Sequence, residues 1–268
     1  MNITETRKAA AEIRKLTIAA MQSAGYGHIG GSMSIADVLA VLYTDIMRVD
    51  PKNPRDPNRD WLVLSKGHCA PGLCAALAHK GYFPKEEVLT LNQNGTRLPS
   101  HCDRLKTPGV DISTGSLGQG ISMASGVALG NAMQGINSHV YVILGDGELN
   151  EGQNWETAQF LAHRQMDNIT VIVDANQRQL DGYTEDVCKQ FDIAEKFRAF
   201  GLHTLECDGH DVRALHDALV QKPAVLVMHT EKGHGCNFAE IPGFNHYMVI
   251  TDDMARAACE EIDRRLTA

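Results

Sequence analysis

The sequence predicts an α/β fold in which a doubly wound, mostly parallel sheet is covered by helices on both faces. Two observations lead to this prediction. Four short runs are rich in Val, Ile and Leu, as strands buried on both faces are, and helix-like segments lie between them. No repeat, linker or low-complexity tract divides the chain. We therefore expect residues 1–268 to form a single domain.

Composition limits the classes of partner. The chain has 268 residues, 43% of them hydrophobic, which is enough for one substantial core. It carries 25 Lys and Arg against 33 Asp and Glu, a net charge of -8, so nucleic acid and anionic membranes are not expected partners. The charged N-terminus is unlike a signal peptide. Seven scattered cysteines without metal-binding spacing favour reduced thiols in a cytoplasmic protein.

The N-terminal half is expected to be mostly helical. Residues 5–24 form the first helix, because apolar residues recur on one stripe, and the glycine-rich stretch after it ends the helix. A second helix is expected to open at Ser34, with Asp37 completing a capping box. A polar loop, a strand and a helix then follow at residues 50–60, 61–65 and 71–81.

The C-terminal half alternates between strands and helices. Residues 92–118 are expected to be irregular, and the helix after them is rich in small residues, which lets its backbone pack close to a neighbour. The strands are expected at residues 140–144, 169–174, 202–207 and 224–230. The helices are expected at residues 118–135, 153–165, 190–200, 210–221 and 251–267.

Two polar residues follow neighbouring strands at the point where each strand ends. Asp146 lies between two glycines after the first of these strands, and Asn176 follows the next. Ligands of parallel sheets bind beyond the carboxyl ends of the strands. Carboxylate and amide oxygens suit Mg²⁺ or Ca²⁺, and a glycine amide at a helix start suits an anion. A Gly-Asp-Gly turn alone is weak evidence, but its pairing with Asn176 predicts a metal and diphosphate site.

Several long motifs make the chain resemble the N-terminal part of transketolase. "GDGELNEGQNWE" with Asn176 looks like the thiamine-diphosphate motif. "AGYGHIGGSMSIADVL", "NRDWLVLSKGHCAPGL", "LPSHCDRLKTPGVDISTGSLGQGIS" and "TEKGHGCNFAEIPGFNHYM" are similar to further segments of that family, in the same order. The resemblance implies a thiamine-diphosphate-binding fold.

The resemblance also implies which residues bind the cofactor. Asp146, Asn176 and the backbone carbonyl of Arg178 would hold a divalent metal, Mg²⁺ or Ca²⁺. The amide of Gly147 would meet the diphosphate of thiamine diphosphate. The cofactor-binding residues implied in this way are His68, Gly115, Ser116, Leu117, Gly147, Glu148, Asn176, Lys232 and His246.

Three histidines would act on the sugar. The resemblance implies catalytic or binding roles for His28, His101 and His246, and imidazole can donate to or accept from sugar hydroxyls near neutral pH. His210 and His234 receive no role. The chain departs from the family pattern in three places. It lacks the proline usual after His28, it has Cys102 after His101 where proline is usual, and Asn245 and Tyr247 replace Trp and Gly.

The implied activity is that of the N-terminal subunit of a two-subunit transketolase, which moves a two-carbon ketol unit from a ketose, or ketose phosphate, to an aldose. In the family, a glutamate of a pyrimidine-binding domain activates the cofactor. We therefore expect a C-terminal partner subunit with that domain, in a two-fold symmetric heterotetramer. Glu151 and Glu156 match positions at the family's subunit interface.

Two other functions stay open. The alpha subunit of a 2-oxo acid dehydrogenase also carries the thiamine-diphosphate motif, although it has no obvious use for His28, His68 and His101 as sugar contacts. A catalytically silent binding or regulatory module could keep the same fold. The sugar is equally open, because a phosphorylated pentose, a branched sugar phosphate and a sulfonated sugar all fit the motifs.

Overall fold

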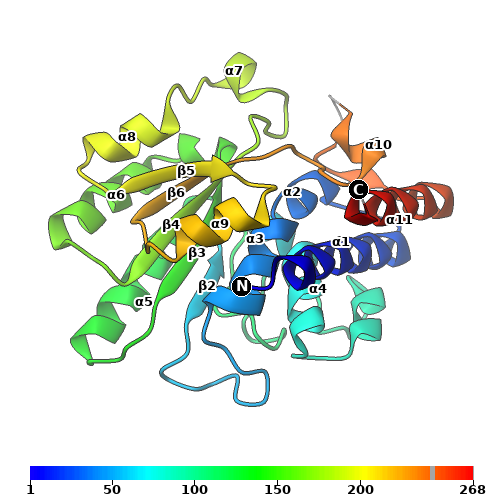
Figure 1. The fold of residues 1–268 in the computed structure, drawn as a ribbon, viewed down its shortest axis with the longest axis horizontal. Helices are drawn as coiled ribbons and strands as arrows, with labels where there is room; N and C mark the ends of the chain where they lie inside the picture. Colours follow the sequence, from blue (N-terminus) through cyan, green and yellow to red (C-terminus); the bar gives the residue numbers. More distant parts are fainter. Residues whose placement is uncertain (242–244, 268) are drawn as a thin grey trace.

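A five-stranded parallel sheet forms the centre of the computed structural model, which describes residues 1–241 and 245–267. The strand order is β2-β3-β4-β6-β5 (Figure 1). The strands are β2 (Trp61–Leu64), β3 (Val140–Gly145), β4 (Ile169–Ala175), β5 (Thr204–Asp208) and β6 (Val225–His229). Their register is parallel throughout. The predicted fold class is confirmed, and every predicted strand is present.

Helices cover both faces of the sheet, and each face has its own core (Figure 1). One face is covered by α5 (Gln119–Met133), α6 (Gly152–Arg164) and α8 (Ile193–Ala199). The other is covered by α1 (Ile3–Ala24), α3 (Ala36–Val41), α4 (Ala70–Lys80) and α9 (Val212–Leu219). In β3, Val140, Val142 and Leu144 face the first core, and Tyr141 and Ile143 face the second. This alternation is what a doubly wound sheet requires.

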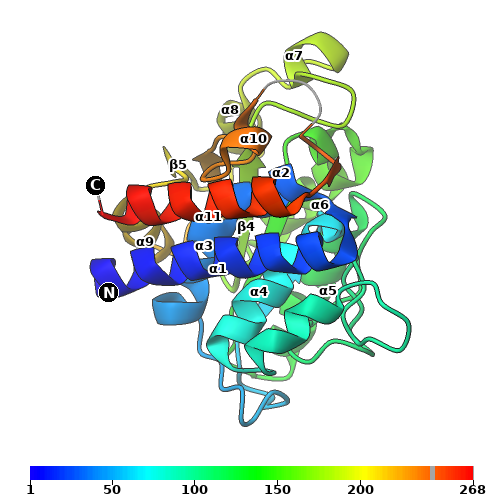
Figure 2. The ribbon, with the colours of Figure 1, turned by 90° about the vertical axis from the view of Figure 1, so that its right-hand side faces the viewer.

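The remaining elements are mostly short. Helix α11 (Asp252–Thr267) lies beside α1 and runs in the opposite direction (Figure 2). The short elements are β1 (Tyr26–Gly27), α2 (Ile29–Ser34), η1 (Leu42–Ile46), η2 (Gly67–Cys69), η3 (Lys85–Thr90), η4 (Gly147–Asn150), α7 (Thr184–Val187), α10 (Asn237–Glu240) and β7 (Met248–Val249). Among the described helices, none is both long enough and apolar enough to cross a membrane.

The capping box predicted at Ser34 is wrong. Helix α2 begins directly after His28, and Ser34 is its last residue. The Ser34 hydroxyl donates to Asp174, 2.6 Å away, and Asp37 pairs with Arg14. Both side chains have partners that are distant in sequence, and these buried contacts outweigh the local capping preference.

The predicted close packing of the small-residue helix is confirmed. A Cβ added to Gly120, in the first turn of α5, would lie 2.4 Å from the Ser65 hydroxyl oxygen at the end of β2. Only glycine allows this approach. The loop before α5 therefore lies against the carboxyl end of the sheet.

A two-stranded antiparallel ribbon joins the start of the chain to its end. Tyr26 of β1 pairs with Val249 of β7, and Gly27 pairs with Met248. This ribbon was not predicted from the sequence. Because His28 follows β1 and His246 precedes β7, the pairing brings these two histidines together.

Candidate active site

The candidate site lies at the carboxyl edge of the sheet, where the loops after β2, β3, β4 and β6 meet. A cavity of about 240 Å³ opens there. It is lined by Gly31, Lys66, His68, Leu117, Gly145, Asp146, Gly147, Glu148, Asn176, Arg178, Gln179, Leu180, Lys232 and His246. The cavity therefore gathers most of the residues that the sequence assigned to the cofactor.

Asp146 presents a buried carboxylate to the cavity. Its side chain is 2% exposed, and it makes no ion pair with any residue that the structure describes. One oxygen accepts from the Gly147 amide at 2.7 Å, and the other accepts from the Gln177 amide at 2.5 Å. Burial, and then the nearby Asp174, raises the pKa of Asp146 to about 7. A divalent cation would relieve this cost.

Asn176 and Arg178 lie on the loop after β4, which is held to Asp146 by the hydrogen bond from the Gln177 amide. The Asn176 amide nitrogen donates to Asp174 at 3.0 Å, which fixes the orientation of the amide and leaves its oxygen to act as an acceptor. That oxygen accepts from the Arg178 amide at 3.0 Å. Three oxygen donors, from Asp146, Asn176 and the Arg178 carbonyl, are the donor type that Mg²⁺ and Ca²⁺ prefer.

A buried ion pair between Lys66 and Asp174, which was not predicted from the sequence, lies beside this loop, because Asn176 donates to Asp174. The Lys66 ammonium contacts Asp174 and lies 3.1 Å from the Gly31 carbonyl oxygen. Burial alone would lower the pKa of Lys66, but the Asp174 carboxylate outweighs it and raises that pKa. Thr230 also donates to Asp174. The sequence feature that could have predicted this pair is a lysine directly after one predicted strand and an aspartate at the end of another.

Lys232 places an ammonium in the cavity without a carboxylate partner among the described residues. It is 3% exposed, and its Nζ lies 3.2 Å from the Gln179 carbonyl oxygen and 3.1 Å from His246 Nδ1. Burial, and then the charge of Lys66, lowers the pKa of Lys232 to about 8. A buried, unpaired cation of this kind favours an anionic ligand.

Four histidines form a cluster, and two of them, His68 and His246, line the cavity. The ring centre of His28 lies 5.3 Å from His68, 5.6 Å from His101 and 5.3 Å from His246. Burial lowers the pKa of all four, to about 4 for His28, about 2 for His68 and about 3 for His246. The rings are therefore neutral at pH 7, and each can donate one hydrogen bond and accept another. Tyr247 packs edge-on against His28, with 5.0 Å between ring centres.

Glu148 lines the cavity, but its carboxylate holds the surrounding loops. One oxygen accepts from the Ser65 hydroxyl at 2.5 Å and from the Gly118 amide at 2.8 Å. The other accepts from the Gly145 amide at 3.1 Å. Burial raises the pKa of Glu148. The structure thus shows Glu148 tying the loop before α5 to the end of β3.

The other predicted residues lie at the rim. Leu117 reaches the cavity, whereas Gly115 and Ser116 are exposed, with Gly115 beside the His101 ring. Glu151 and Glu156 are exposed as well.

All seven cysteines carry free thiols. The fold and this cavity are those of an α/β enzyme with a cofactor site at the carboxyl ends of its strands.

Comparison with known proteins gives the family. The sequence profile described as "Transketolase, thiamine diphosphate binding domain" matches residues 5–247. The chain therefore belongs to the transketolase family. Two predictions are thereby confirmed: the chain is part of a transketolase enzyme, and its cofactor is thiamine diphosphate. The match covers nearly the whole chain, so the family assignment does not depend on one motif.

Two of the relatives are single subunits. The chain is 46% identical over 258 residues to the 6-deoxy-6-sulfo-D-fructose transketolase subunit of Clostridium sp. (strain MSTE9), covering 94% of each chain. It is 38% identical to one subunit of the apulose-4-phosphate transketolase of Actinobacillus succinogenes, covering 96% of this chain and 95% of that one.

Undivided transketolases match over part of their length. The chain is 36% identical to human transketolase and spans 41% of it. The crystal structure of transketolase from Campylobacter jejuni superposes with a TM-score of 0.89 at 29% identity, covering 98% of this chain and 43% of that one. The chain thus corresponds to a little under half of an undivided transketolase.

Proposed function

We propose that this chain is the N-terminal subunit of a two-subunit transketolase that moves a two-carbon ketol unit from a ketose to an aldose, with thiamine diphosphate and a divalent metal. Residues 1–268 would act as one domain, since both cores share the sheet. Relatives that match along nearly their whole length, and whose names describe single subunits, support the division into two chains.

One observation carries the proposal: the cavity holds two buried charges of opposite sign that have no ion-pair partner among the described residues. Asp146 and Lys232 both line the cavity, and both are buried. A metal ion would neutralise the carboxylate, and a diphosphate would neutralise both the ammonium and the metal. The pair therefore fits a metal–diphosphate group better than it fits a neutral ligand.

The remaining residues take complementary roles in this proposal. Asp146, the Asn176 oxygen and the Arg178 carbonyl hold the metal, while Lys232 and the Gly147 amide meet the diphosphate. Thiamine diphosphate supplies the carbon nucleophile on which ketol transfer depends. Gly115, Ser116, Leu117 and Glu148 form the wall beside its rings, and His68 and His246 lie beside its diphosphate.

The neutral histidines suit a polyhydroxylated substrate. His28 and His101 can each donate to one sugar hydroxyl and accept from another, and His246 closes the cluster beside Lys232. This cluster favours ketol transfer over the 2-oxo acid dehydrogenase alternative, whose substrate offers few hydroxyls. The names of the relatives support a ketose that carries a sulfonate or a phosphate.

A partner subunit would cover the rim. Gly115 and Ser116 are exposed beside the cavity, and a reacting carbanion must be shielded from water. Met123 of α5 and Phe160 of α6 are each 37% exposed on two helices that pack together, and Glu156 lies one turn before Phe160, which supports an interface on this side. A C-terminal subunit with the pyrimidine-binding domain fits there, in a heterotetramer. Free thiols support a cytoplasmic location.

Reconstitution tests the proposal. Ketol transfer from 6-deoxy-6-sulfofructose and from xylulose 5-phosphate is measured with this chain, with its C-terminal partner, and with both, and light scattering gives the mass. We expect activity only in the mixture, and its loss in Asp146→Ala. Full activity of the chain alone would contradict the division into two chains. Activity that requires a 2-oxo acid and lipoamide would favour the dehydrogenase. An assembled complex that binds no thiamine diphosphate would favour a silent module.

A further inference from the structure

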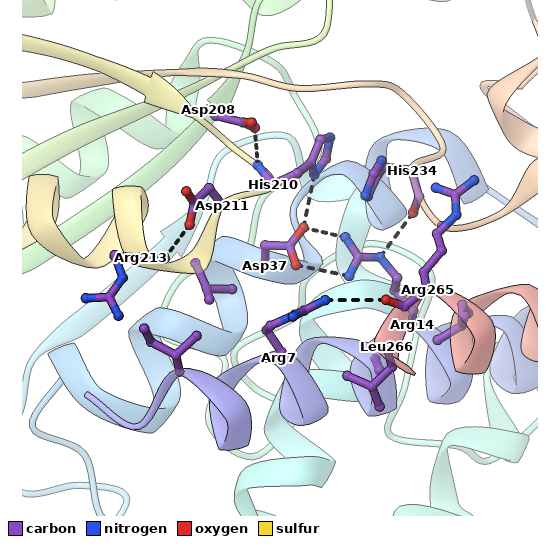
Figure 3. A pocket seen from close by; sticks show the side chains of 15 residues that line it. Arg7, Arg14, Asp37, Asp208, His210, Asp211, Arg213, His234, Arg265 and Leu266 are labelled. Carbon is purple, nitrogen blue, oxygen red and sulfur yellow. Dashed lines mark hydrogen bonds and ion pairs between the residues drawn. The ribbon is translucent and has the colours of Figure 1, made fainter. Parts of the chain in front are cut away.

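A buried cluster of Arg14, Asp37 and His210 lies outside the candidate site (Figure 3). These residues come from α1, from α3 and from the turn between β5 and α9. Both nitrogens at the end of Arg14 pair with the Asp37 carboxylate, one of them at 3.0 Å. His210 Nδ1 lies 3.0 Å from the same carboxylate. Arg14 is 6% exposed and Asp37 is 5% exposed, at the floor of a cavity of about 490 Å³.

The proton on His210 can be placed from its partners. Its Nε2 accepts from the backbone amide of Glu231 at 2.8 Å, so the proton lies on Nδ1 and is donated to Asp37. Asp37, His210 and His234 have the spacing of a three-ligand metal site. Both His210 nitrogens are already used, however, and Arg14 occupies both Asp37 oxygens. The group therefore fits a hydrogen-bond network rather than a metal site.

The cluster holds residues 231–235, the segment that carries Lys232. His210 binds the Glu231 amide, and Arg14 Nε donates to the His234 carbonyl oxygen at 3.0 Å. Gly235, at φ +85°, packs so closely that an added Cβ would lie 2.8 Å from Arg14 Cδ. His234 stacks on His210, with 3.6 Å between ring centres.

Further hydrogen bonds hold the same segment beside the candidate site, whose cavity Lys232 lines. The Gly233 amide donates to the Gly30 carbonyl oxygen at 3.0 Å. The Asn245 side chain donates to the Lys232 carbonyl oxygen at 3.3 Å. These hydrogen bonds add to those from the cluster, and the Lys232 side chain extends from the segment into the cavity.

We propose that Arg14, Asp37 and His210 are positioning residues for Lys232: they fix the backbone from which its ammonium reaches the diphosphate. A buried ion pair adds little net stability over apolar residues of the same volume, so its main effect here is a fixed geometry. Lys232 has several rotatable bonds, and its charge is useful only if its backbone does not move. The diphosphate part of this proposal rests on the proposed function.

Two substitutions of His210 separate its two hydrogen bonds. His210→Asn keeps a donor at the δ position, facing Asp37, and loses the acceptor for the Glu231 amide. His210→Gln places an amide oxygen at the ε position and keeps that acceptor. His216→Gln is the matched control. His216 lies in α9 and pairs with Asp45 at 2.8 Å, without a hydrogen bond to residues 231–235.

Hydrogen exchange of residues 231–236 is the first readout, because it needs no cofactor. We expect at least tenfold faster exchange in His210→Asn, and rates within threefold of the unmodified chain in His210→Gln and His216→Gln. The second readout is the Kd of thiamine diphosphate with Mg²⁺ in the assembled complex, by calorimetry. We expect about tenfold weaker binding in His210→Asn alone, equivalent to about 1.4 kcal/mol.

The two readouts distinguish this proposal from the proposed function. Unchanged exchange in His210→Asn, or equal acceleration in both His210 variants, would overturn the positioning role. Faster exchange with unchanged Kd would show that the cluster holds the segment but does not position Lys232 for a ligand, which also overturns it. If the unmodified complex binds no thiamine diphosphate, the proposed function fails, while exchange still decides whether the cluster holds the segment.

Discussion

Replacing Asp146 with asparagine should stabilise the metal-free chain while it removes the metal site. The carboxylate is 2% exposed and has no ion-pair partner in the described part of the chain. Burial, followed by the effect of Asp174, raises its pKa to about 7. At pH 8 the folded chain therefore contains an ionised carboxylate that is less favourable there than in water.

The magnitude follows from the pKa. A change from the ordinary 3.8 to about 7 corresponds to about 4 kcal/mol, at 1.36 kcal/mol for each pKa unit. Because the folded-state pKa of this acid is raised, the penalty is absent below about pH 4, grows with pH, and is complete above about pH 7. Between pH 5.5 and pH 8, the free energy of unfolding of Asp146→Asn should gain about 2 kcal/mol relative to the unmodified chain.

Urea unfolding in the presence of a chelator measures this difference at the two pH values. The variant loses a hydrogen bond from Gly147 or Gln177, at a cost of about 1–3 kcal/mol, but that cost is the same at both pH values. Asp208→Asn, at the exposed end of β5, is the control for the substitution itself. A stability difference that does not vary with pH would refute the reasoning.

Magnesium with thiamine diphosphate should reverse the order of stability. A ligand that binds only the folded state stabilises it by about 4.1 kcal/mol at a concentration 1,000 times its Kd, which exceeds the lead of about 1–3 kcal/mol that the variant has at pH 8. The unmodified chain, in its complex, should gain this stabilisation and Asp146→Asn should not. Equal gains for both proteins would remove Asp146 from the metal site.

Three further predictions concern the cavity. His28→Ala and His101→Ala should each lower turnover about ten- to a hundredfold without changing cofactor affinity, because each loses one hydrogen bond to the sugar. Steady-state kinetics at saturating cofactor measures the turnover. A large loss of cofactor affinity with normal turnover would contradict this prediction. Lys232→Met should weaken cofactor binding at least tenfold in calorimetry, equivalent to about 1.4 kcal/mol or more. It should also stabilise the cofactor-free chain at pH 7, because burial lowers the pKa of Lys232 to about 8 and so disfavours the charged form. Unchanged cofactor affinity would place the diphosphate elsewhere. Gly147→Ala would bring a methyl group within 2.8 Å of Gln179 Cβ and should lower the free energy of unfolding in urea by about 1–3 kcal/mol. In the control Gly126→Ala, in α5, the added methyl group would have no atom within 4 Å outside the neighbouring helix backbone, and the change should be neutral or stabilising.

The sequence by itself determined the fold class and the place of the site. Strands that are apolar along nearly their whole length, such as residues 140–144, are buried on both faces, so their pattern predicts a parallel sheet with two helical layers. In such a sheet the carboxyl ends of adjacent strands share one edge, so the proximity of Asp146 and Asn176 could be predicted from the sequence. The long motifs, read in order, were sufficient to give the family.

Tertiary structure alone decided which side chains pair. Lys66 with Asp174, and Arg14 with Asp37 and His210, join residues that are far apart in sequence, and no local pattern encodes such a distance. The same contacts explain the error at Ser34, whose hydroxyl bonds Asp174 instead of capping a helix. A local preference is worth about 1 kcal/mol, whereas leaving a buried charge without its partner costs several, so the long-range pairing prevails.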